Sequence, residues 1–378
     1  MILAFNTRLL IKDKLDGIGW FTFHTLKRIV KNNPEHTFYF IFDRKYSDEF
    51  IFAENVKPVI VGPPTRHPVL WNFWLRYSLP RFLKKIKADI FVSPDGFLPY
   101  EITIPSLIVI HDINFVHRPK DLPYLTALFY LKRFSEFAQK AGKIATVSEY
   151  SKNDITNTYL ISPKKISVVY NGADEAFKPV EENIKIKIRN KYSDGKPYFV
   201  FVGSLHPRKN IIGLIEAFDV FKKKTNSDLK LLIVGPFFFK NSTMMNIYKQ
   251  LKYKDDILFT GRLDMDELTK VVGSAYALTM VSYFEGFGIP LLEAMYCDVP
   301  VISSNVTSMP EVTEEAALYV NPSDIYDIAD KMEKMASNNE LRESLIKKGR
   351  IQRTKFSWDK TAEKLWNEIE KLMQEVKE

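Results

Sequence analysis

Residues 198–224, YFVFVGSLHPRKNIIGLIEAFDVFKKK, determine the kind of fold we expect for this chain. The stretch begins with an apolar run that suits a strand buried on both faces, turns at Gly203 and continues as an amphipathic helix. A buried strand followed directly by a helix is the repeating unit of a parallel, doubly wound sheet. Arg208 and Lys209 stand where the helix starts, so this loop is also a candidate anion site, with solvated loop charges as the alternative.

The same alternation of short apolar runs and amphipathic stretches continues in both directions. The first series of expected strands is Met1–Phe5, Thr37–Phe42, Val56–Val61, Asp89–Ser93, Ser106–His111, Lys143–Val147 and Ile166–Tyr170. The second series is Tyr198–Val202, Lys230–Val234, Ile257–Thr260, Tyr276–Val281, Val299–Ser303 and Ala317–Val320. A polar break at Asn171–Lys196 separates the two series, which predicts two α/β domains.

Composition restricts the class of protein. With 378 residues, 46% of them apolar, the chain is long enough for two domains with real cores. A single cysteine, Cys297, excludes a disulfide framework and a cysteine-based zinc site. The first apolar run is broken at Asn6 and Arg8 and reads as a strand, not a signal peptide. No apolar run reaches 18 residues, so we expect a cytoplasmic protein that does not cross a membrane.

The positive charge is concentrated in the first half of the chain. Residues 1–180 contain 25 Lys and Arg against 17 Asp and Glu, whereas residues 181–378 contain 29 of each. Such an excess suits an anionic partner, although ordinary surface charge is an alternative. Nucleic acid is disfavoured because no groove-reading or RNA-binding signature occurs.

Segment 66–87 is the most basic part of this half. It mixes Trp, Phe and Leu with six bases and no acid; the bases are Arg66, Arg76, Arg81, Lys84, Lys85 and Lys87. This composition predicts peripheral contact with the inner face of a membrane. A core helix with a solvated basic face is the alternative.

A second motif lies at residues 282–295, SYFEGFGIPLLEAM. Glu285 follows an expected strand and Glu293 falls eight residues later, inside an expected helix. The turn through Gly286 and Gly288 exposes backbone N–H groups, and each carboxylate can accept hydrogen bonds from sugar hydroxyls. The motif therefore suits a ligand with two sugars, unless it is an ordinary glycine turn flanked by surface acids.

GSLHPRKN, EGFGIPLLEAM and SNVTSMPEV together resemble the donor-binding half of retaining, nucleotide-sugar-dependent glycosyltransferases of family 4. The segments GIGWFTFHTLKRI, IVIHDINF, TVSEYSKNDI and VVYNGAD match the first half in the same order, so the resemblance covers nearly the whole chain. It is greatest to mannosyltransferase-like group 1 members that build bacterial polysaccharides. The resemblance implies the GT-B fold, in which two Rossmann-like domains face a cleft. Residues 1–175 would bind the acceptor, helix 358–378 would cross back onto that domain, and residues 176–357 would bind the donor.

The resemblance also implies roles for single residues. Arg208 and Lys209 would bind the donor diphosphate, Glu293 the ribose, and Glu285 the transferred sugar. Gly203 is a further implied donor-site residue, and Arg262 and Leu263 would flank the base. Gly17 and Gly19, in an N-terminal loop, would approach the phosphate. The remaining implied donor-site residues are Gly286, Phe287, Gly288, Ile289, Leu292 and Ser148. His111 would touch the reacting centre, although a structural pair with Asp112 is the alternative that its residues leave open.

Asp264-Met-Asp266 has the form of a metal-binding Asp-x-Asp. Because Glu267 stands three residues after Asp264 at an expected helix start, we interpret the motif as a capping box. The resemblance implies catalysis without metal or other cofactor.

The reaction implied is transfer of a hexose, with mannose from GDP-mannose as first choice, from a nucleotide sugar to a lipid-linked or free saccharide, with retained configuration. A GT-B nucleotide-sugar epimerase and a catalytically idle nucleotide-binding scaffold are the alternatives.

Overall fold

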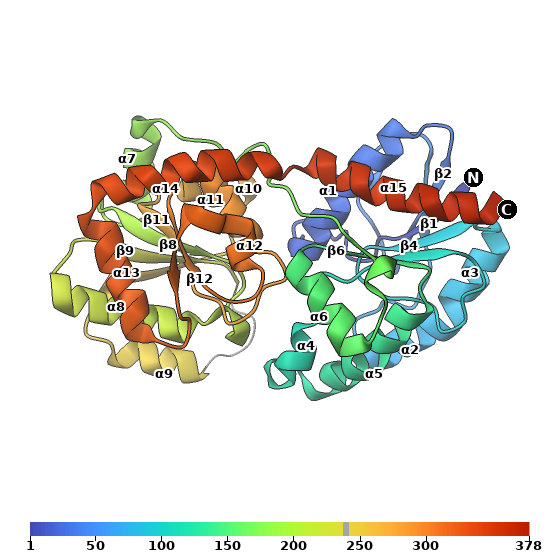
Figure 1. Ribbon diagram of the computed structural model, residues 1–378, viewed down its shortest axis with the longest axis horizontal. Helices are drawn as coiled ribbons and strands as arrows, with labels where there is room; N and C mark the ends of the chain where they lie inside the picture. The colour runs from blue at the N-terminus through green and yellow to red at the C-terminus, as the bar shows by residue number, and fades with distance from the viewer. Residues whose placement is uncertain (237–241, 378) are drawn as a thin grey trace. The chain divides into compact units, whose positions relative to one another are not determined.

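The computed structural model describes residues 1–236 and 242–377 of the chain (Figure 1). The chain forms two compact units: Met1–Gly172 together with Ser357–Glu378, and Ala173–Phe356. Each unit is a parallel sheet with helices on both faces (Figure 1). Each unit is thus Rossmann-like and doubly wound, as the alternating pattern predicts.

The sheet of the first unit has the order β3-β2-β1-β4-β5-β6-β7. Its strands are β1 (Ile2–Asn6), β2 (Thr37–Phe42), β3 (Val56–Ile60), β4 (Ile90–Ser93), β5 (Ser106–Val109), β6 (Lys143–Thr146) and β7 (Ile166–Val168). The winding changes direction between β1 and β4, which pair in parallel. In sheets of this kind, ligands bind at the carboxyl ends of the strands beside this switch point.

The helices of the first unit include the C-terminal one. They are α1 (Gly17–Asn32), α2 (Pro68–Phe73), α3 (Leu79–Ile86), α4 (Asn114–His117), α5 (Tyr124–Lys140), α6 (Glu149–Tyr159) and α15 (Trp358–Lys377). A π-helical turn, Trp74–Ser78, joins α2 to α3.

Helix α15 lies beside α1 in the first unit (Figure 1). The Ser357 hydroxyl accepts a hydrogen bond from Lys360 N at 3.2 Å and so caps the start of α15. Trp358 and Trp366 are both buried, and the Trp358 ring stacks on His24 at 4.8 Å. The face of α15 that carries Trp358 and Trp366 therefore packs against this unit, as the resemblance implies for helix 358–378.

The sheet of the second unit has the order β10-β9-β8-β11-β12-β13. Its strands are β8 (Tyr198–Val202), β9 (Lys230–Val234), β10 (Ile257–Gly261), β11 (Ala277–Met280), β12 (Val301–Ser304) and β13 (Ala317–Val320). Its helices are α7 (Glu182–Tyr192), α8 (Ile211–Thr225), α9 (Ser242–Gln250), α10 (Met265–Gly273), α11 (Ile289–Tyr296), α12 (Met309–Thr313), α13 (Ile325–Ser337) and α14 (Asn339–Gln352). The switch point lies between the parallel neighbours β8 and β11.

Every strand expected from the sequence is present, and the ends differ by up to two residues. The agreement has a simple cause: the strand side chains of both central sheets are buried on both faces, so the strands read as continuous apolar runs. Within the described residues, no helix has the length and apolar composition needed to cross a bilayer.

Candidate functional site

The loop after β8 carries two cations to the carboxyl end of the central strand of the second sheet. Gly203 ends this strand with φ +149°, in the region of backbone space that favours glycine. A short 3-10 turn, Pro207–Lys209, follows, and the His206 ring accepts a hydrogen bond from Arg208 N at 3.3 Å. The loop therefore presents Arg208 and Lys209 at the start of α8, as the sequence predicts.

Asn210 holds this loop in place. Its side-chain amide donates to the carbonyls of Val281 at 3.1 Å and Pro322 at 2.7 Å, and its Oδ1 accepts from Gly213 N at 3.2 Å. One buried side chain thus caps α8 and ties the loop to two other segments of the unit. Asn210 lies in the motif GSLHPRKN, but its neighbours in sequence do not indicate this role.

Both cations contact one carboxylate, that of Glu285. Arg208 Nη1 lies 2.7 Å from Glu285 Oε2, and Lys209 Nζ lies 2.5 Å from Oε1. Glu285 is only 4% exposed. Burial alone would raise its pKa, but the two neighbouring cations outweigh burial and lower the pKa to about 2. Glu285 is consequently paired with two positive charges.

The backbone of Glu285 is clamped by the segment SNVTSMPEV. Glu285 N donates to Thr307 Oγ1 at 3.3 Å, and the Ser308 hydroxyl donates to the Glu285 carbonyl at 2.9 Å. These two hydroxyls orient the carboxylate toward the cations. Their role was missed because nothing in the local sequence pairs residues 22 and 23 positions apart.

Helix α11 begins at the glycine turn and carries Glu293. Gly288 has φ +96° at the N-cap, and an added Cβ would come within 2.9 Å of a Leu291 methyl group. Glu293 is partly buried, and burial, with a smaller contribution from Asp174, raises its pKa to about 8. In this structure the Glu293 carboxyl group is therefore mostly protonated at neutral pH.

Most of the other predicted residues of this turn and of α11 are buried in the second unit. Gly286 and Phe287 are buried, and the Phe287 ring packs edge-on against Phe356 at 5.5 Å. Leu292 is fully buried, whereas Ile289 is partly exposed at the start of α11.

Arg262 and Leu263 follow β10 in the second unit. Arg262 is exposed and Leu263 partly buried. Asp264 caps α10 by accepting from Glu267 N at 2.9 Å, which confirms the cap. The Glu267 carboxylate, in contrast, binds Lys191 Nζ at 2.5 Å and the Tyr192 hydroxyl at 2.8 Å, so its role in a capping box is corrected.

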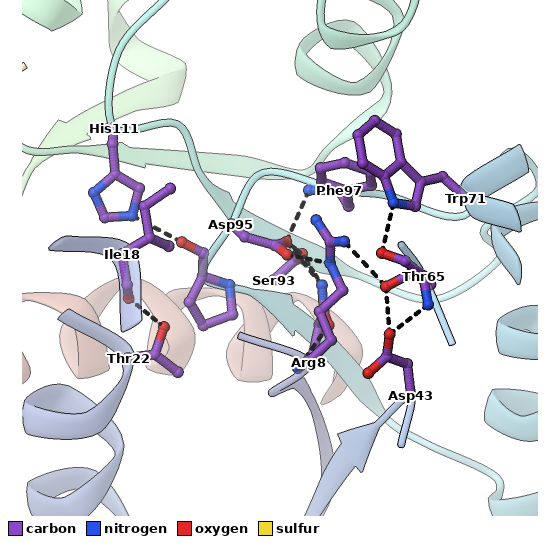
Figure 2. Close-up of polar contacts among 12 residues, drawn as sticks. Arg8, Ile18, Thr22, Asp43, Thr65, Trp71, Ser93, Asp95, Phe97 and His111 are labelled. Carbon is purple, nitrogen blue, oxygen red and sulfur yellow. Dashed lines mark hydrogen bonds and ion pairs between the residues drawn. The ribbon is translucent and has the colours of Figure 1, made fainter. Parts of the chain in front are cut away.

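In the first unit, His111 stands just beyond β5 and faces Pro94 (Figure 2). His111 Nε2 lies 2.9 Å from the Pro94 carbonyl oxygen, which can only accept, so Nε2 carries the proton. Burial lowers the pKa of His111, which keeps the ring neutral and leaves Nδ1 as an acceptor. Asp112 accepts from Asn114 N at 2.9 Å. Among the described residues, the imidazole of His111 makes its hydrogen bond to Pro94 and not to Asp112.

The remaining predicted residues of the first unit lie at the starts of two helices. Gly17 and Gly19 were expected in a loop, but α1 already begins at Gly17. The reason is Asp16, whose side chain accepts from Gly19 N at 3.0 Å and starts the helix. Ser148 is fully buried and caps α6 by accepting from Ser151 N at 3.0 Å.

Comparison with known proteins places the chain in a family. The profile of the Glycosyltransferase Family 4 group matches residues 15–177, and that of Glycosyl transferases group 1 matches residues 182–352. The O-antigen chain mannosyltransferase RfbU of Salmonella typhimurium is 32% identical over 74% of this chain and 75% of its own. The chain belongs to the family 4, group 1 glycosyltransferases.

Two other proteins resemble this glycosyltransferase over nearly its full length. O-antigen chain mannosyltransferase B of Escherichia coli is 26% identical over 92% of this chain and 94% of its own. The crystal structure of Anabaena HepE in complex with UDP-glucose superposes with a TM-score of 0.76 at 14% identity, covering 98% and 99% of the two chains. The likeness to HepE concerns the fold, which is GT-B.

The glycosyltransferase also contains a buried polar network that the sequence analysis missed (Figure 2). Arg8 Nε lies 2.5 Å from Asp95 Oδ2, and Arg8 Nη1 donates to Thr65 Oγ1 at 3.2 Å. Asp43 in turn accepts from the Thr65 hydroxyl at 2.6 Å. The only sequence signal was the break in the first apolar run at Asn6 and Arg8.

Proposed function

We propose that this glycosyltransferase transfers a mannosyl group from a nucleoside diphosphate sugar, GDP-mannose being the first choice, to a saccharide acceptor in cell-surface polysaccharide synthesis. The observation that carries the proposal is the buried cluster in which Arg208 and Lys209 share the single carboxylate of Glu285. The choice of mannose is supported by the printed names of RfbU and mannosyltransferase B.

The two cations of the cluster suit a diphosphate. Charge-assisted hydrogen bonds to phosphate are strong, and they are strongest where water is excluded. As the bond between the sugar and the phosphate breaks, negative charge develops on the leaving nucleoside diphosphate. Arg208 and Lys209 would stabilise that charge, a role that a divalent metal fills in other enzymes, so the proposed reaction requires no metal.

The two glutamates would bind hydroxyl groups on the donor. Glu293, on α11, would accept hydrogen bonds from the ribose, and its ionised form is the better acceptor. When the phosphates bind Arg208 and Lys209, the Glu285 carboxylate would accept hydrogen bonds from hydroxyl groups of the transferred sugar. Gly286 and Gly288 keep the backbone of this turn open to close approach.

We further propose that the configuration of the sugar is retained through attack on the same face that the phosphate leaves. The charge of Glu285 is compensated by two cations, which suits binding of a hydroxyl and weakens it as a covalent nucleophile. Neutral His111, in the first unit, offers Nδ1 as an acceptor for a hydroxyl of the substrates. The first unit would bind the acceptor, which we propose is lipid-linked.

Ligand binding and product analysis test the proposal together. We expect GDP and GDP-mannose to raise the unfolding temperature more than UDP, ADP or their sugars do, and Lys209→Ala to reduce the shift. Lys223→Ala is the matched control, because Lys223 is an exposed lysine of the neighbouring helix α8.

Products are then examined with and without a mannose-containing saccharide acceptor. The proposal predicts an α-linked product by NMR, since the donor is α-linked. A β-linked product would contradict retention, and an epimerised sugar formed without acceptor would replace transfer by epimerisation. Unchanged unfolding temperatures with every nucleotide would contradict the donor site.

A further inference from the structure

Exposed large apolar side chains concentrate on two helical segments of the first unit. Within the described residues, twelve such side chains are exposed, and seven of them lie here: Val69, Phe73, Tyr77, Tyr124, Leu125, Leu128 and Leu131. The first three belong to α2 and the following π turn, and the other four belong to α5. The remaining five are scattered over the chain, as single surface residues normally are.

On the first segment the apolar residues form a stripe. Val69, Phe73 and Tyr77 are spaced four residues apart along the continuous helical stretch 68–86. The rings of Phe73 and Tyr77 are 5.3 Å apart, and the Arg81 guanidinium lies 5.9 Å from the Tyr77 ring. The stripe is therefore apolar at one end and cationic at the other, which is the pattern of a helix that lies in a membrane interface.

The two segments are neighbours, held together by buried aromatic rings. The Trp71 ring stacks on Tyr130 of α5 at 5.7 Å and contacts Phe129 at 5.1 Å. Figure 1 shows α2 and α5 close together within this unit. Tyr124, Leu128 and Leu131 recur at intervals of four and three residues, the spacing of one helix face.

The two tryptophans of segment 66–87 belong to the core, which corrects the reading of the whole segment as interfacial. Trp71 Nε1 donates to the Thr65 carbonyl at 2.8 Å (Figure 2), and Trp74 Nε1 donates to the Val61 carbonyl at 2.6 Å. Both rings are buried. These anchors fix the helix rigidly, so that its exposed stripe is preformed.

Among the described residues, the cations of this segment have no counter-ions. Arg66, Arg76, Arg81, Lys84, Lys85 and Lys87 are all exposed, and the structure gives none of them an ion pair with a described residue. Helix α13 of the second unit differs, because its Lys331 and Lys334 pair with Asp327 and Asp330 at 2.9 and 3.0 Å. Six exposed cations beside an apolar stripe suit an anionic partner with an apolar interior.

A small cleft beside the stripe suits a phosphate group. It has a volume of about 250 Å³ and is lined by Arg76, Tyr100, Glu101, Arg133, Glu136 and Lys140. The guanidinium groups of Arg76 and Arg133 lie 5.8 and 4.5 Å from the Tyr100 ring. Arg133 pairs with Glu136 at 2.7 Å, and the three bases of the cleft outnumber its two acids.

We propose that α2, the π turn, α3 and α5 form one docking surface for an anionic phospholipid bilayer. Val69, Phe73, Tyr77 and the exposed leucines of α5 enter the interface. The six bases bind lipid phosphates, and one of them, Arg76, does so from its cleft. The proposal deepens the proposed function, on which it rests for the expectation that a lipid-linked acceptor lies at the bilayer.

Co-sedimentation of the full chain with vesicles tests the surface. Vesicles of phosphatidylcholine with 30% phosphatidylglycerol should bind the chain, and vesicles of phosphatidylcholine alone should not. Replacing three bases, Arg81→Gln, Lys84→Gln and Lys85→Gln, should weaken binding on the order of 100-fold. The control removes the same charge from exposed lysines of the second unit, Lys187→Gln, Lys223→Gln and Lys224→Gln, and should change binding less than threefold.

The apolar stripe is tested separately. Phe73→Ser with Tyr77→Ser should reduce binding at least tenfold, while Tyr326→Ser with Ile351→Ser, exposed apolar residues of the second unit, should leave it unchanged. No binding, equal binding to neutral vesicles, or equal losses in the two base triples would overturn the docking surface.

The docking variants also separate this proposal from the proposed function. They should retain the thermal shift with nucleotide and transfer to a soluble saccharide. A chain that binds anionic vesicles but no nucleotide would support docking and contradict the proposed function. A chain that transfers mannose but does not bind vesicles would support the proposed function and contradict docking.

Discussion

The switch points of the two sheets carry the same kind of cluster with a different charge balance. In the first unit, Arg8 follows β1 and pairs with Asp95, which follows the adjacent strand β4. In the second unit, Arg208 and Lys209 follow β8 and pair with Glu285, which follows the adjacent strand β11. The two positions are topologically equivalent, so the two clusters can be compared directly.

The first cluster is balanced and closed. Asp95 Oδ1 accepts from Asn6 Nδ2 at 2.7 Å, from the Ser93 hydroxyl at 2.9 Å and from Phe97 N at 3.2 Å. The Arg8 guanidinium lies 3.9 Å from the Phe97 ring, which covers it (Figure 2). One cation meets one anion, and the side chains are 6% and 4% exposed.

The second cluster pairs one carboxylate with two cations and is partly open. Arg208 and Lys209 both contact Glu285, and their side chains are 21% and 10% exposed. Two cations with access to solvent, and not position at a switch point alone, therefore distinguish the cluster that we propose binds the donor.

The largest effect is expected from Asp95→Asn. It leaves the Arg8 charge buried without its counter-ion, which should lower the free energy of unfolding by about 3–5 kcal/mol. Urea denaturation of the purified variant measures the loss. Arg8→Met combined with Asp95→Leu should recover much of the stability, and a loss below about 1 kcal/mol in the single variant would contradict a locked pair.

Lys209→Ala should lower the rate of transfer by roughly 10²–10³-fold, because one charge-stabilising donor is lost from the leaving diphosphate. Initial rates at saturating donor measure the change. Urea denaturation should show little loss of stability, in contrast to Asp95→Asn. A rate within threefold of the wild type would contradict the role of Lys209 in the anion site.

Glu285→Gln should separate binding from turnover. Removing the carboxylate that competes for the two cations should tighten binding of nucleoside diphosphate by roughly tenfold, while transfer becomes slower because the sugar loses its acceptor. Calorimetry and initial rates are compared on the same preparation. Weaker binding of the nucleotide would show that Glu285 serves mainly to orient the cations.

Glu293 should make nucleotide binding depend on pH. Binding to the ionised carboxylate requires loss of a proton below its pKa of about 8, so affinity should rise by up to tenfold per pH unit between pH 6 and 8 and then level. Calorimetry across this range should show the slope in the wild type. Glu293→Gln should abolish it, and an unchanged slope in that variant would assign the proton to another group.

The same group affects the stability of the unliganded protein. The folded pKa of Glu293 is raised above its ordinary value of 4.5, so the folded state retains a proton that the unfolded state loses. The stability it contributes is complete below pH 4.5 and is lost as the pH rises through about 8. Glu293→Gln should therefore be less sensitive than the wild type to a change from pH 6 to 9 in urea denaturation.

Local patterns predicted the strands, the Asp264 cap and the loop with Arg208 and Lys209, because each depends on neighbours in sequence. They did not predict the Arg8–Asp95 pair, whose members are 87 residues apart. They also could not decide the role of segment 66–87. Its composition suits both a core and a membrane interface, and the structure assigns Trp71 and Trp74 to the core but Phe73 and Tyr77 to the surface.

The doubly wound architecture follows from the order of residues along the chain, since continuous apolar runs that alternate with amphipathic stretches bury their side chains well in that arrangement. Which charges are neutralised follows instead from the folded structure. Charge balance depends on carboxylates brought from distant strands, such as Asp95 to Arg8 and Glu285 to Lys209. Their attraction is set by distance and burial, neither of which is encoded in local spacing.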